Sequence, residues 1–146
     1  MKYGFALLIG LLLSLPVHAT GANDPKTVVL DFYKLAMQEF KPREAFARYA
    51  AADFVEHSAD SAGGTAASTV TFLEGLIKQF PDPHWEVVRS VAEGDLVFLH
   101  VRVTPAPKAP AIAVAEIFRV RNGKIVEHWD VIQHEPAKAV NPNSMF

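Results

Sequence analysis

The hydrophobic period of the chain changes once, at Pro81-Asp82-Pro83. Before this point apolar residues recur at helical spacing, and beyond it apolar and polar residues alternate as they do in strands. The helices are expected at about 24–40, 42–51 and 65–80, and the strands at 84–91, 95–103, 111–121 and 124–133. Helices followed by a run of strands predict an α+β fold, with the N-terminal helices packed on one face of a curved antiparallel sheet.

Turn signals fix how the strands follow one another. Asn122-Gly123 stands between two alternating runs, which is the strongest short cue for a β-hairpin. The segment 53–57 has no helical period and is expected as a short extended piece ahead of the last helix. A curved sheet with helices across its concave side leaves room for a pocket between the two layers.

The first nineteen residues have the pattern of a secretory signal. Lys2 precedes an apolar run from Phe5 to Leu15, and Val17-His18-Ala19 places small residues at the positions that precede a cleavage site. The apolar run is shorter than the roughly 20 residues that a membrane-spanning helix needs. We expect cleavage after Ala19, a mature domain over 20–146, a periplasmic or secreted location and no membrane attachment afterwards. An uncleaved anchor is the alternative.

Composition excludes several classes of function. The chain has no cysteine, so thiol chemistry, iron–sulfur clusters and thiolate metal sites are excluded. Its 14 Lys and Arg residues are outnumbered by 16 Asp and Glu residues and are scattered along the chain. Nucleic-acid binding is therefore not expected, because it needs a clustered basic surface.

Ionisable residues interrupt the apolar pattern of three predicted strands. His128 and Asp130 alternate with apolar residues on one strand face, Glu116 does so on the preceding strand, and His100 does so on the strand before that. Burying such groups costs several kcal/mol unless they are paired, so we expect the four side chains to surround a common space. Each one taken alone also has a structural explanation, such as a cross-strand ion pair.

Four segments carry a resemblance to a known family. They are Phe54-Val55-Glu56-His57, Glu116-Ile117-Phe118-Arg119-Val120, Asn122-Gly123-Lys124-Ile125-Val126-Glu127-His128-Trp129-Asp130-Val131-Ile132-Gln133 and Asn141-Pro142-Asn143-Ser144-Met145-Phe146. Together they resemble the SnoaL-like polyketide cyclases, which belong to the nuclear transport factor 2-like superfamily of cone-shaped α+β folds. The resemblance implies that 20–146 form one SnoaL-like domain.

The resemblance also implies a mechanism. SnoaL-like cyclases use an aspartate as general acid/base for an intramolecular aldol condensation, without a metal or an organic cofactor. Asp130 occupies the matching position, His128 and His100 are its expected catalytic neighbours, and His57 is expected in the same cavity. The remaining residues expected to bind substrate are Glu116, Phe54, Trp85, Phe118, Val114 and Ile132. The sequence departs from the family pattern at Ser58-Ala59, where Asn-Pro is usual, and at Glu116, where aspartate is frequent.

Three functions remain open from the sequence. The first is a cofactor-independent aldolase-type cyclase, isomerase or lyase that acts on a small hydrophobic carbonyl compound. The second is a non-catalytic domain that binds a small apolar ligand in the same pocket. The third is a zinc or iron site built from His57, His100 and His128 with Glu116 or Asp130, for which no local spacing motif is present.

The outer face of the sheet predicts a homodimer. The apolar residues assigned to that face are Val97, Leu99, Val101, Ile117, Trp129 and Val131. An apolar sheet face of this size is usually covered, and a second copy of the same chain is the simplest cover.

Overall fold

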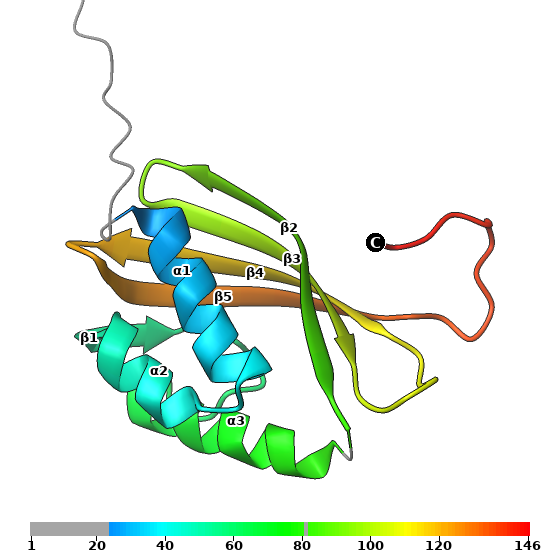
Figure 1. Ribbon diagram of the computed structural model, residues 1–146, viewed down its shortest axis with the longest axis horizontal. Helices are drawn as coiled ribbons and strands as arrows, with labels where there is room; N and C mark the ends of the chain where they lie inside the picture. Colours follow the sequence, from blue (N-terminus) through cyan, green and yellow to red (C-terminus); the bar gives the residue numbers. More distant parts are fainter. Residues whose placement is uncertain (1–23, 81) are drawn as a thin grey trace, which may run out of the picture.

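The computed structural model describes residues 24–80 and 82–146, so the predicted signal segment 1–19 lies outside the described residues. The helices are α1 (Pro25–Tyr33), the π-helix η1 (Lys34–Gln38), α2 (Pro42–Tyr49) and α3 (Ala66–Gln79). The strands are β1 (Ala50–Glu56), β2 (His84–Glu93), β3 (Leu96–Thr104), β4 (Ile112–Arg121) and β5 (Lys124–His134). The helices lie across one face of a curved sheet (Figure 1), and the predicted α+β class is confirmed.

The helix starts follow from local sequence. The Asp24 side chain accepts a hydrogen bond from the Thr27 N–H at 3.0 Å, and Pro25 stands at the first helical position of α1. Thr65 and Ser68 form a reciprocal capping box at the start of α3. These caps satisfy backbone donors that the first helical turn leaves without a partner.

The first predicted helix differs from a regular α-helix in its second half. Over Lys34–Gln38 the chain widens into a π-helix, and the Glu39 N–H donates to the Lys34 carbonyl at 2.9 Å. Three consecutive residues, Leu35, Ala36 and Met37, are buried there. The helical segment ends before Phe40, whose φ of 56° lies in the left-handed region.

The sheet has five strands in the order β1-β5-β4-β3-β2. The antiparallel order β2 to β5 is the predicted meander, with the Asn122-Gly123 hairpin between β4 and β5. The extended piece at 53–57 was predicted without a partner, and the structure makes most of it part of β1, which pairs in parallel with β5. Glu56 is thereby aligned with His128.

The register decides which residues face the helices. In β3, Val97, Leu99 and Val101 are almost fully buried, with exposed fractions of 0–1%. Leu99 lies opposite Glu116 of β4, whereas His100 lies opposite Ala115. Directly opposite residues share a face, so Glu116 points to the inner face and His100 to the outer face.

The observed register changes which residues lie on the outer face, from which the homodimer was predicted. Val97, Leu99 and Val101 were assigned to the outer face, but they belong to the core because they pack under the helices. The outer face instead exposes Val91, Phe98 and Val131, with exposed fractions of 63%, 40% and 65%. A homodimer through this face stays a prediction.

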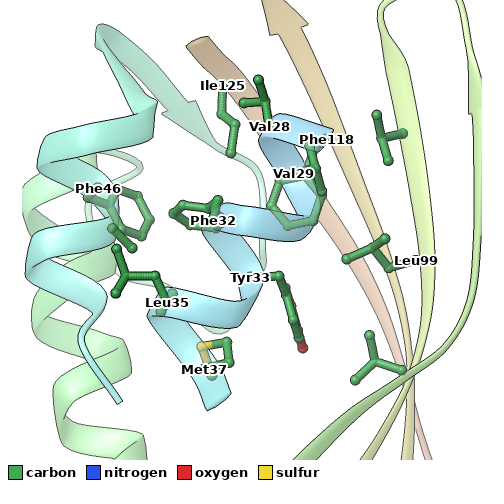
Figure 2. Packing of buried hydrophobic residues seen from close by; sticks show 14 of the residues in the cluster. Val28, Val29, Phe32, Tyr33, Leu35, Met37, Phe46, Leu99, Phe118 and Ile125 are labelled. Atoms are coloured by element: carbon green, nitrogen blue, oxygen red, sulfur yellow. The ribbon is translucent and has the colours of Figure 1, made fainter. Parts of the chain in front are cut away.

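The core lies between the inner face of the sheet and the helices. Figure 2 shows Phe32 of α1 between Phe46 of α2 and the sheet, and the ring centroids of Phe32 and Phe46 are 5.1 Å apart. The ring of Phe118 from β4 lies 5.8 Å from Phe32 at 67°. Edge-to-face aromatic pairs of this kind add about 0.5–1.5 kcal/mol to the free energy of burial. They hold α1 at a fixed distance above β4.

Within residues 24–80 and 82–146, none of the helices has the length and apolar character required to cross a membrane.

Candidate active site

A cavity of about 250 Å³ lies between the inner face of the sheet and the helices. Most of its wall is apolar, and the polar side chains come mainly from β1, β4 and β5 and from the loop after β1. The lining residues are Phe32, Tyr33, Met37, Phe46, Phe54, Glu56, Ser58, Asp60, Ser61, Thr69, Phe72, Leu73, Leu76, Phe80, Trp85, Val103, Ile112, Val114, Glu116, Phe118, His128, Asp130, Ile132 and His134. The pocket predicted from the curved sheet is confirmed.

All but two of the predicted site residues line this cavity. Those that do are Asp130, His128, Glu116, Phe54, Trp85, Phe118, Val114 and Ile132. The two that do not are His57 and His100. His134, expected on the surface, is exposed but also borders the cavity.

The placement predicted for His100 is wrong. Its ring lies on the outer face of the sheet, where Nδ1 is 2.8 Å from Nη1 of Arg89. The C-terminal Phe146 stacks beside it with a centroid distance of 5.6 Å. His100 shares a face with Ala115 rather than with Glu116, because the register of β3 on β4 differs by one residue from the predicted grouping.

The placement predicted for His57 is also wrong. Its ring is stacked on Trp129 at a centroid distance of 4.6 Å and an interplanar angle of 2°. Its Nε2 lies 3.8 Å from Oε1 of Glu127, again outside the cavity. Successive residues of an extended chain point to opposite faces, so the burial of Glu56 in the interior turns His57 outward.

His128 is held between two carboxylates. Its Nδ1 lies 2.7 Å from Oε1 of Glu56, and its Nε2 lies 2.7 Å from Oε2 of Glu116. A carboxylate accepts hydrogen bonds, so both ring nitrogens donate and the ring is an imidazolium. Burial alone would lower the pKa of His128, but the hydrogen bonds and charges of Glu116 and Glu56 raise it to about 10.

Glu56 anchors this arrangement in the interior. Its side chain is 1% exposed and accepts hydrogen bonds from the Ser58 N–H at 2.9 Å and from the Thr69 hydroxyl at 3.3 Å. Burial opposes its ionisation, yet the hydrogen bond and charge of His128, together with these donors, lower the pKa of Glu56. Glu56 is therefore a carboxylate at neutral pH.

Tyr33 closes the chain of hydrogen bonds on the helical side. Its hydroxyl donates to Oε1 of Glu116 at 3.1 Å, longer than the 2.7–2.8 Å typical of O–H···O bonds. Burial, followed by the charge of Glu116 and the hydrogen bond to it, raises the pKa of Tyr33 well above its ordinary value. The phenol therefore keeps its proton and remains a donor at the wall of the cavity.

Asp130 differs from the two glutamates in its surroundings. Its Oδ2 accepts a hydrogen bond from the Ser58 hydroxyl at 2.8 Å, and its Oδ1 has no hydrogen-bond partner among the described residues. Burial raises the pKa of Asp130, the Ser58 hydrogen bond opposes this, and the charge of Glu116 raises the pKa further. Asp130 is thus a carboxyl with one open oxygen and a proton affinity above that of a solvent-exposed aspartate.

The SnoaL-like domain matches residues 29–128 of this sequence, about two thirds of the chain. The chain belongs to the SnoaL-like domain family. The family predicted from the four sequence segments is therefore confirmed, and the match ends at His128, at the centre of the hydrogen-bonded cluster.

Several solved structures share this fold. AclR from Streptomyces galilaeus, described as a candidate hydroxylase, is 27% identical with a TM-score of 0.63, covering 77% of this chain and 91% of its own. IdmH from Streptomyces antibioticus, a candidate polyketide cyclase, is 22% identical with a TM-score of 0.62. The alignment covers 74% of this chain and 91% of IdmH. A candidate SnoaL-like polyketide cyclase from Jannaschia sp. CCS1 is 17% identical with a TM-score of 0.65. The alignment covers 83% of this chain and 90% of the Jannaschia protein. The search of curated proteins returned no match.

Sequence reasoning missed Tyr33, Glu56 and Ser58, whose side chains hydrogen-bond directly to the predicted residues of this SnoaL-like site. Glu56 carried a usable signal, because it alternates with the apolar Phe54 in an extended segment and should share its face. Tyr33 and Ser58 carried none. A tyrosine on an apolar helix face and a serine in a loop acquire a role only through residues more than 70 positions away, Glu116 and Asp130.

The ligand set considered for a metal does not converge in this fold. His57 and His100 lie on the outer face, and both nitrogens of His128 are engaged by glutamates. Across the part of the chain that the structure describes, no group of three or more His, Asp or Glu side chains is arranged to hold a metal ion.

Proposed function

We propose that this SnoaL-like protein is a cofactor-independent acid/base enzyme of the cyclase or isomerase type. Its substrate is a small, mostly apolar carbonyl compound bound in the cavity. The observation that carries the proposal is Asp130, which lines the mostly apolar cavity, keeps one oxygen without a hydrogen-bond partner among the described residues, and has its pKa raised by burial. A carboxyl in this setting combines the two properties that proton abstraction next to a carbonyl requires, access to the substrate and increased basicity.

The other ionisable groups are less suited to the role of base. His128 carries two protons at neutral pH and has no free lone pair. Glu56 is 1% exposed and is already hydrogen-bonded to His128, Ser58 and Thr69. Both oxygens of Glu116 accept hydrogen bonds, from Tyr33 and from His128. Asp130 alone among these carboxyls keeps an oxygen without a protein partner in the described structure.

The proposed reaction begins with transfer of a proton from the carbon next to the substrate carbonyl to Asp130. Negative charge then develops on the carbonyl oxygen, and the hydroxyl of Tyr33 is the candidate donor to it. This hydroxyl lines the cavity and can rotate from its long hydrogen bond with Glu116 toward a substrate oxygen. Protonated Asp130 returns the proton to a different carbon or oxygen, which gives an isomerisation or completes a ring closure.

Hydrogen–deuterium exchange tests this proposal without knowledge of the substrate. The protein is incubated in heavy water with a panel of ketones, β-keto acids and hydroxy-ketones, and deuterium uptake is followed by mass spectrometry. Asp130→Asn is expected to lower the exchange rate at least 100-fold, the lower range for loss of a general base. Asp53→Asn is the matched control, because Asp53 is exposed and does not line the cavity.

A non-catalytic ligand-binding domain is the second candidate. It is favoured by the large apolar share of the cavity wall, which would retain a small hydrophobic molecule without any chemistry. Absence of exchange for every compound, with Asp130→Asn still folded by circular dichroism and still binding ligand, would replace the enzyme proposal with this one.

A further inference from the structure

Most of the ionisable side chains that line the cavity are acidic. Four of them are acidic, Glu56, Asp60, Glu116 and Asp130, and the nitrogen-bearing ones are two histidines, His128 and His134. Within residues 24–80 and 82–146, no lysine or arginine lines the cavity. The arginines that form ion pairs, such as Arg102 and Arg119, lie on the outer face or at exposed positions.

The positive charge of His128 is not available to a ligand. Both of its N–H groups point at glutamate oxygens 2.7 Å away. The cluster thus holds three acidic side chains, Glu56, Glu116 and Asp130, and a single cation, His128. An anionic group in the cavity would therefore meet net negative charge in a medium that screens it poorly.

The rest of the wall consists largely of aromatic and aliphatic side chains. The aromatic ones near the polar end and along the helices include Phe32, Phe54, Phe72, Phe80, Trp85 and Phe118. The faces of aromatic rings carry negative electrostatic potential, which attracts cations and disfavours anions. The wall and the polar cluster thus favour the same sign of ligand charge.

We propose that the cavity selects its ligand by charge, taking an apolar molecule whose polar end is cationic in preference to a neutral one, and excluding molecules that bear a carboxylate there. This charge preference would define the substrate class of the proposed function. It rests on that function only in requiring that the cavity binds a ligand. The open oxygen of Asp130 is the acceptor for the N–H or O–H group of that ligand. Carbonyl compounds that bear a carboxylate therefore fall outside the substrate class, and carbonyl compounds that bear an amine or another cationic or hydrogen-bond-donating group fall within it.

Trp85 provides a direct reporter of binding. The chain has two tryptophans, of which Trp85 lines the cavity with 3% exposure and Trp129 lies on the outer face beside His57. In Trp129→Phe the fluorescence comes from Trp85 alone. This protein is titrated at pH 7.5 with cyclohexanemethylamine, cyclohexanemethanol and cyclohexanecarboxylate, which share one ring and differ in their polar group.

The expected order of affinity is amine, then alcohol, then carboxylate, with at least a tenfold gap between the alcohol and the carboxylate. In the same background Asp130→Asn is expected to reduce the ratio of amine to carboxylate affinity at least tenfold, whereas Asp53→Asn leaves the ratio unchanged. A carboxylate that binds as tightly as the alcohol, an amine that binds more weakly than the alcohol, or an equal effect of both substitutions overturns the proposal.

The outcome is independent of turnover. Charge selection without deuterium exchange would remove the proposed enzyme activity and leave this inference intact. Deuterium exchange that depends on Asp130, together with equal affinity for the acid and the alcohol, would remove this inference and leave the proposed enzyme activity intact. Cyclohexane without a polar group measures the apolar contribution and checks that all three compounds enter the same cavity.

Discussion

The two faces of the sheet carry the same kinds of residue in different surroundings. On the inner face, His128 with a 13% exposed side chain lies 2.7 Å from Glu56, which is 1% exposed. On the outer face, His57 with a 37% exposed side chain lies 3.8 Å from Glu127, which is 29% exposed. The inner pair raises the pKa of His128 to about 10. Burial and short contacts, rather than residue type, make this histidine a fixed charge.

Ion pairs on the outer face contribute less to the free energy of unfolding than those on the inner face. Glu86 and Arg102 pair at 3.6 Å with side chains 48% and 38% exposed, and water screens their attraction. The inner pairs exclude most of this screening. Removing one partner there leaves a buried charge without compensation.

The largest effect is expected from removing the inner glutamate. Glu56→Ala leaves the Nδ1–H of His128 and the Ser58 N–H without an acceptor in the interior, and it is predicted to lower the free energy of unfolding by about 3–5 kcal/mol. Glu86→Ala on the outer face is the matched control, with an expected loss under about 1 kcal/mol. Urea denaturation measures both, and equal losses would contradict the difference between the faces.

The next effect concerns pH. Because the folded protein keeps the His128 proton up to about pH 10, whereas an unfolded histidine loses it near 6.5, the folded state binds more protons between these values. The stabilisation is complete below about pH 6.5 and declines as pH rises toward 10, by up to about 1.4 kcal/mol per pH unit. Chemical denaturation at intervals from pH 6 to 10 measures this slope.

His128→Gln is the control for the pH dependence. It removes the titrating group, so the decline assigned to His128 is expected to disappear even though the variant is less stable at pH 6. A slope that persists unchanged in this variant would assign the proton uptake to another group.

The smallest effect is expected from the outer histidines. His100→Ala and His57→Ala remove side chains that lie outside the cavity, and each is predicted to change the free energy of unfolding by less than about 0.5 kcal/mol. Neither is expected to change ligand binding reported by Trp85. A large loss of binding in His100→Ala would restore the role that the sequence pattern predicted for it.

Much of the fold could be predicted because its signals are local. Caps such as Asp24 and Thr65, the Asn122-Gly123 turn and the change from helical to alternating period all act within a few residues. Asp130, His128 and Glu116 were predicted to lie together because buried ionisable groups need partners, and they do so because β4 and β5 are joined by a short hairpin. The turn leaves little freedom in how the two strands align.

The errors arose where alignment depends on distant residues. β3 and β4 are joined by the longer 105–111 connection, so alternation separated the two faces of β3 without showing which one is buried. A β-bulge between Arg119 and Val120 likewise brings Ile125 into the core, although strict alternation would place it on the face opposite to His128. The partner of β1 was not predictable for the same reason, since a parallel pair has no turn to define it.

The sequence by itself determined the α+β class, the SnoaL-like family, the C-terminal meander and the position of Asp130 in the cavity wall. Only the tertiary structure decided that Glu56 holds His128 as a cation, that Ser58 contacts Asp130, and that His57 and His100 lie outside the cavity. The physical reason is that periodicity divides the residues of a strand between two faces without showing which face is buried. The pairing of strands that are far apart in the chain determines the buried face, and with it which charged side chains lie in contact.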